Sequence, residues 1–64
     1  METIQTTYYI LMVQYNAQEK WQLFHIYEDL PSAIYMKKYA EKKQIENKSK
    51  EVYKIFTYIL SKNA

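Results

Sequence analysis

The chain has 64 residues, with no Gly, no Cys, a single Pro and eleven aromatic residues, of which eight are Tyr. A chain of this length forms one domain, residues 1–64, and buries only roughly 60% of the surface that its unfolded form exposes. The lack of Cys excludes disulfides and thiolate metal sites, and the lack of Gly excludes the glycine-rich loops that cradle nucleotide phosphates. Nine Lys and seven acidic residues give a net charge of +2, too small to mark a strong polyanion binder.

The first half of the chain predicts a β-hairpin. Residues 6–15 (TTYYILMVQY) and 21–28 (WQLFHIYE) are rich in β-branched and aromatic residues, which favour strands. The polar residues 16–20 between them have the length of a hairpin loop, and Asn16 tolerates a positive φ in a chain without glycine. Residues 1–5 are expected to form a short tail.

A helix is predicted over residues 30–45. Asp29 can cap its first N–H groups, and Pro31 has the fixed φ of a first helical turn. Asn47 stands where a left-handed residue commonly ends a helix. The apolar residues recur at helical spacing and form a broad stripe, which consists of Leu30, Ala33, Ile34, Met36 and Ala40.

Residues 51–60 carry two conflicting signals. Val52, Ile55 and Ile59 have helical spacing, but the run VYKIFTYIL is nearly all β-branched or aromatic. We favour a strand, because a three-stranded sheet is more stable than a lone hairpin. The predicted fold is therefore α+β, a ββαβ domain with sheet order 2-1-3, one helix on one face and a tail at 61–64. The alternative is ββαα with a C-terminal helix.

Strand alternation leaves both faces of this sheet apolar, and one helix can cover only one of them. We expect the helix to cover Leu11, Val13, Phe24, Ile26, Ile55 and Ile59, although the two faces could be exchanged. The opposite face is then an exposed apolar patch that a partner should cover, most simply a second copy in a two-fold homodimer. This predicted partner-binding or dimer face contains Tyr8, Ile10, Met12, Trp21, Leu23, His25, Tyr27, Phe56 and Tyr58.

No combination of residues favours catalysis or metal binding. His25 is the only histidine, no Cys is present, and the serines lack any activating motif. A second His or a spaced carboxylate pair for a metal ion is also missing. We therefore expect a protein that is not an enzyme and that uses no metal or other cofactor.

The lysines are concentrated in the second half of the chain. They can contact a polyanion or an acidic partner, and together with the aromatic residues they support an alternative function in single-stranded nucleic-acid binding by base stacking. We favour a protein partner, because the lysines belong mainly to the helix and its exit loop, away from the aromatic face. The candidate contact residues are Lys37, Lys38, Lys42, Lys43, Lys48 and Lys50.

These observations favour a small non-enzymatic protein-binding module, an inhibitor or regulatory adaptor. A composition heavy in Lys, Ile and Tyr and free of Arg and Gly is typical of AT-rich bacterial or phage genomes, which favours an anti-defence, anti-CRISPR-like inhibitor. The N-terminus has no basic segment of a signal peptide, and no apolar run approaches the ~20 residues that span a bilayer. We expect a cytoplasmic protein without membrane contact.

Overall fold

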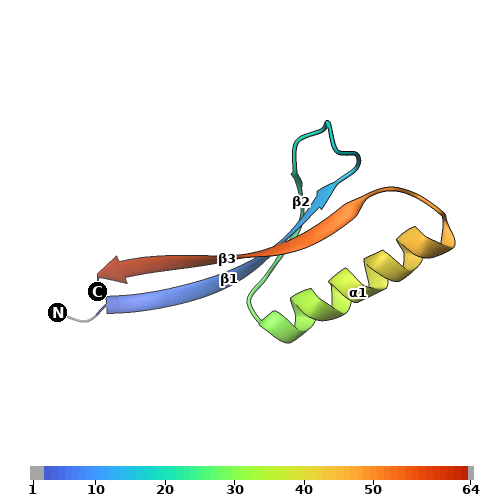
Figure 1. Ribbon diagram of the computed structural model, residues 1–64. Coiled ribbons are helices and arrows are strands. Elements are labelled where there is room, and N and C mark those ends of the chain that lie inside the picture. The colour runs from blue at the N-terminus through green and yellow to red at the C-terminus, as the bar shows by residue number, and fades with distance from the viewer. Residues whose placement is uncertain (1–2, 64) are drawn as a thin grey trace.

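The computed structural model describes residues 3–63, which form three strands and one helix. They follow one another in the predicted ββαβ order, and α1 lies along one side of the sheet (Figure 1). The α+β fold is therefore confirmed. The elements are β1 (Thr3–Gln14), β2 (Gln22–Tyr27), α1 (Leu30–Glu46) and β3 (Val52–Asn63).

The sheet has the order β2-β1-β3, with β1 in the centre and antiparallel to both neighbours. β3 pairs with β1 without interruption, from Val52 opposite Gln14 to Asn63 opposite Thr3. The alternative of a C-terminal helix is wrong, because the ladder to β1 and the β-branched composition of β3 outweigh its helical spacing.

Both long strands extend further than the sequence predicts. The tails predicted at 1–5 and 61–64 are largely strand, because residues 3–5 pair with residues 61–63, while residues 1–2 and 64 lie outside the described residues. Since β2 pairs only with residues 9–13 of β1, residues 3–8 and 58–63 pair with each other alone. We call this two-stranded ribbon the arm. It projects beyond α1 (Figure 1) and gives a radius of gyration of 14.6 Å, against about 11 Å for a compact chain of this length.

The hydrophobic core lies between α1 and the sheet. Leu11 and Val13 are 0% and 1% exposed, and Ala33 and Ala40 of α1 are buried against the same side. The small alanine side chains allow the helix to approach the strands closely. The expectation that α1 covers Leu11 and Val13 is confirmed, but Ile59 was wrongly placed under the helix, because it lies in the arm and is 57% exposed.

The first turn of α1 is capped as the sequence predicts. The backbone N–H of Ser32 donates to Oδ2 of Asp29 over 2.8 Å, and the Ser32 hydroxyl donates to Oδ1 over 2.9 Å. These hydrogen bonds, the backbone one foremost, hold the pKa of Asp29 below its ordinary value of 3.8. The capping contribution to stability is therefore present above that value and is lost as the pH falls through the lowered pKa.

The last turn of α1 ends in a Schellman motif. The N–H of Ser49 donates to the carbonyl of Gln44, and the N–H of Lys48 donates to the carbonyl of Ile45. Asn47 has a right-handed conformation, so its predicted role as the left-handed residue is wrong. Lys48 takes that role with φ of 55°, the only positive φ among the described residues.

We predict that Leu11→Ala lowers the free energy of unfolding by about 2–5 kcal/mol, because it opens a cavity in the centre of the core. Ile59→Ala is the matched control on the same side of the sheet and lowers it by less than about 1 kcal/mol. Urea unfolding followed by circular dichroism, at one protein concentration, measures both. Equal losses for the two variants would contradict the position of the core.

We predict that Lys48→Gly raises the free energy of unfolding by about 1 kcal/mol, because glycine adopts a positive φ without the steric cost that a Cβ brings. Lys50→Gly removes the same charge from the same loop at a residue without positive φ, and we expect no gain from it. Thermal unfolding of both variants measures the difference. A loss of stability in Lys48→Gly would contradict the assigned helix end.

Candidate functional site

The side of the sheet that faces away from α1 is lined by apolar and aromatic side chains from all three strands. The register defines this side: Tyr8 lies opposite Tyr58, Ile10 lies between Ile26 and Phe56, and Met12 lies opposite Leu23. We call this side the open face. Its apolar and aromatic residues are Ile4, Tyr8, Ile10, Met12, Trp21, Leu23, Ile26, Val52, Phe56, Tyr58 and Leu60.

Two residues predicted for this surface lie on the other side of the sheet. Leu11 pairs with His25 while the next residue of β1 pairs with Leu23, so that Phe24 is an extra residue in β2. Such a β-bulge shifts the alternation of the strand by one residue. His25 and Tyr27 therefore lie on the side of α1, with ring centroids 4.6 Å apart. The prediction that they belong to the open face is wrong.

The same bulge corrects the position of Ile26. It was expected under the helix, but it pairs with Ile10 on the open face and is 48% exposed. Phe24 remains on the side of α1, where its ring meets the ring of Tyr53 edge-on at 5.7 Å. Desolvation of Tyr53, with the negative charge of nearby Glu51, raises the pKa of its hydroxyl.

An apolar hollow lies in the middle of the open face. Its volume is about 300 Å³, and its walls come from the sheet's three strands: Tyr8 and Ile10 from β1, Ile26 from β2 and Tyr58 from β3. Because the register places these four side chains next to one another, the hollow is part of the sheet surface. It can receive an apolar side chain from a molecule that covers this face.

Beyond the hollow, aromatic rings cluster across the strands. Trp21 and Phe56 meet edge-on with ring centroids 6.2 Å apart, a favourable arrangement for two aromatic rings. Nζ of Lys54 lies 5.7 Å from the centroid of the Phe56 ring, within the range of a cation–π interaction. This end of the open face thus combines two rings and a positive charge.

The two sides of the arm differ in composition. Its open-face side carries Ile4, Tyr8, Tyr58 and Leu60 beside Thr6 and Lys62. The side that continues the helix-covered face carries Thr3, Gln5, Thr7 and Ser61, with Ile59 as the apolar exception. The sheet is therefore apolar under α1 and mostly polar on that side beyond it. The open face stays mostly apolar in the arm, although α1 covers none of it.

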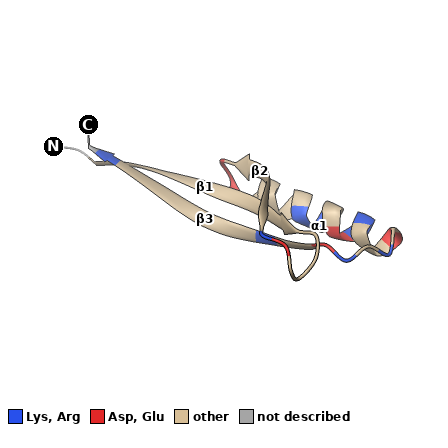
Figure 2. Ribbon diagram, turned by 90° about the horizontal axis from the view of Figure 1, so that it is seen from above, with Lys and Arg blue, Asp and Glu red and all other residues tan. Residues whose placement is uncertain are grey.

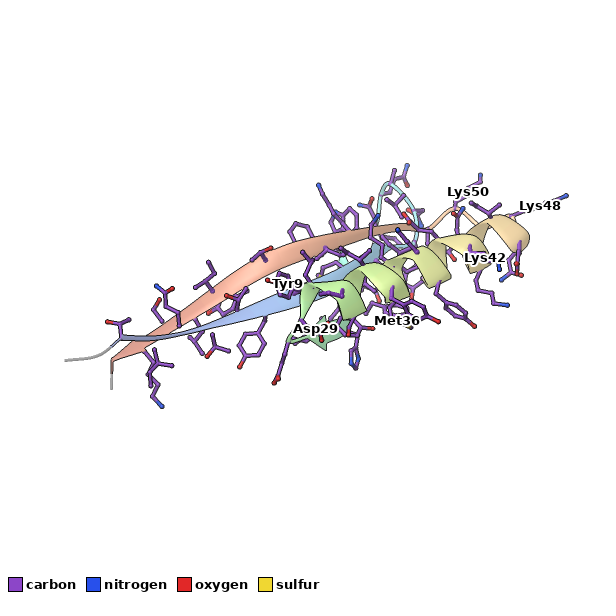
Figure 3. The ribbon with its side chains drawn as sticks, turned by 90° about the horizontal axis from the view of Figure 1, so that it is seen from below. Tyr9, Asp29, Met36, Lys42, Lys48 and Lys50 are labelled. Atoms are coloured by element: carbon purple, nitrogen blue, oxygen red, sulfur yellow. The ribbon has the colours of Figure 1, made fainter. Side chains whose placement is uncertain are left out.

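The predicted lysine contacts lie on α1 and the loop after it. Lys37 donates to Glu41 over 3.1 Å, and Lys43 pairs with Glu46 at 3.5 Å. Charged residues gather on α1 and its following loop (Figure 2), and Lys42, Lys48 and Lys50 surround the last turns of the helix (Figure 3). These lysines, with Lys38, lie in the helix layer and its exit loop, whereas the open face is on the other side of the sheet.

Within residues 3–63, no group of three His, Cys, Asp or Glu side chains is arranged to hold a metal ion. No helix in this part of the chain is long and apolar enough to cross a membrane. Comparisons with protein-family models, with curated proteins and with solved structures find no match to this chain. The case for a function therefore depends on the geometry of the chain's own surfaces.

Proposed function

We propose that this chain is a small, non-enzymatic protein-binding module that acts as an inhibitor or regulatory adaptor in the cytosol, and that its open face is the binding surface. The observation that carries this proposal is the difference between the two sides of the arm. Beyond α1, the helix-covered side of the sheet becomes mostly polar, as a surface in contact with water does, whereas the open face stays mostly apolar, as a surface that contacts a partner does.

The energetics of covering the open face support a stable complex. Removing ~600 Å² of apolar surface from water contributes on the order of 15 kcal/mol before the costs of association. Trp and Tyr, which dominate the energetics of many interfaces, are present as Trp21, Tyr8 and Tyr58. Met12 adds a flexible side chain that adapts to irregular contacts.

The presence of a second surface supports a regulatory role. When the open face is covered, α1 with its exposed lysines stays in solvent and is free to meet an acidic partner. A module with one apolar and one basic surface can connect two molecules or block one. Its Lys-rich, Arg-free composition supports an anti-defence inhibitor of the phage type within this class.

We predict that a tagged copy of the chain captures a bound protein at physiological salt after nuclease treatment. Untagged copies of the chain count as bound protein in this experiment. Leu23→Lys places a charge on the open face and abolishes capture, because the ammonium group must lose its water on binding. Gln22→Lys changes the neighbouring, exposed residue on the other side of the sheet and retains capture. Recovery of nucleic acid alone, in samples without nuclease, refutes the proposal.

A second candidate function is the binding of single-stranded nucleic acid. The position of Lys54 over Phe56, next to Trp21, favours it, because a cation and two rings on one face can contact a phosphate and stack with bases. The lysines of α1 argue against it, since they lie in the helix layer, whereas these rings lie on the other side of the sheet.

For this second function we predict that an oligothymidine binds with an affinity that falls steeply with salt, measured by fluorescence anisotropy. Trp21→Ala weakens binding about 10-fold or more, because a stacking platform is lost. Tyr27→Ala, on the helix-covered side, serves as the control and leaves the affinity unchanged. Binding that responds neither to salt nor to Trp21→Ala excludes this function.

A further inference from the structure

We infer that a second copy of this chain covers the open face, so that two sheets pack face to face in a two-fold dimer with the α1 helices on the outside. This inference rests on the proposed protein-binding function and names the partner of the same surface. Three features of the described chain support it: the area that it exposes, the size of its core and the position of charge on the open face.

The exposed area matches what one subunit of a dimer has to bury. The chain has an accessible surface of 5296 Å², whereas a compact monomer of 7.9 kDa exposes about 4400 Å². The difference, about 900 Å², is close to the ~800 Å² that each partner buries in an interface of standard size. One face-to-face contact thus brings the exposed area to the value of a compact protein.

The small core explains why the partner is another copy. Among the described residues, the buried apolar side chains are Leu11, Val13, Ala33 and Ala40, and two of these are alanines. A core of this size holds a 64-residue fold only weakly, so the chain needs its partner whenever it is folded. A second copy of the chain is made wherever the first is made, and in the same amount. The supply of a foreign partner is not linked to that of the chain in this way.

The distribution of charge permits self-association. Lys54 and Lys62 are the charged strand residues on the open face among residues 3–63, and they stand near opposite ends of β3. Between them the surface is apolar or aromatic around the hollow. Two copies can therefore meet over the centre of the face without burying a charge, while the long lysine side chains extend to water at the rim.

The first experiment measures the molar mass of the wild-type chain by light scattering after size-exclusion chromatography at about 10 μM. We expect twice the 7.9 kDa of one chain. A dimer whose fold depends on association also unfolds at a temperature that rises with protein concentration, and calorimetry over a 100-fold range of concentration measures this shift. A monomeric mass together with a constant unfolding temperature overturns the inference.

The second experiment identifies the face. Tyr58→Lys places a charge at the hollow, and we expect the dissociation constant of the dimer to rise about 30-fold or more, as for a central interface residue. Thr57→Lys is the matched control, because it introduces the same side chain one residue away, on the exposed part of the opposite face. We expect it to remain dimeric. Tyr58→Phe keeps the ring and should also remain dimeric.

Two further readouts keep the test decisive if Tyr58→Lys unfolds. Circular dichroism identifies loss of fold in the variant. In a separate measurement, wild-type chains labelled with a donor are mixed with chains labelled with an acceptor. Exchange between dimers then produces energy transfer, which a strict monomer does not show. A monomer that captures a foreign protein through Leu23 overturns the dimer and leaves the proposed function intact. A monomer that captures no protein overturns both. Dissociation by Thr57→Lys but not by Tyr58→Lys overturns the assigned face.

Discussion

A single helix of 17 residues can cover one side of a three-stranded sheet and not the other, and the rest of this structure depends on that constraint. The covered side holds the core, in which Ala33 and Ala40 allow α1 to lie close to Leu11 and Val13. The uncovered side is also largely apolar, but no element within residues 3–63 packs against it. Folding buries the apolar residues on one face of this sheet, and the dimer that we propose would bury those on the other.

Much of this arrangement can be predicted from the sequence, because the relevant signals are local. Asp29, Ser32 and Pro31 define the start of α1 through side-chain and backbone chemistry within one turn. The composition of residues 52–60 identifies β3, since pairing with a central strand rewards β-branched and aromatic side chains more than helical spacing does. In β1 and β3 the alternation has no interruption, so the predicted faces of residues such as Leu11, Ile10 and Phe56 are confirmed.

The errors arise where one residue changes a pattern that the sequence does not mark. Phe24 stands in a strand rich in apolar and aromatic residues, and no glycine marks the bulge there that exchanges the sides of His25 and Ile26. Lys48 adopts the left-handed conformation although Asn47 has the better intrinsic preference, because the hydrogen bonds of the Schellman motif determine the position. The ends of the arm were missed for another reason: residues 3–5 and 61–63 are mostly polar, and only their pairing with each other makes them strand.

The two outer strands of the sheet differ in how their free edges meet other chains. β2 is short and carries the bulge at Phe24, so its edge is a poor template for another strand. β3 offers an edge of twelve residues without a bulge, but Lys54 and Lys62 interrupt its apolar side. A further chain that adds along this edge in register brings like charges together at both positions. Growth into a fibril is therefore opposed at both edges, which is compatible with the closed dimer that we propose.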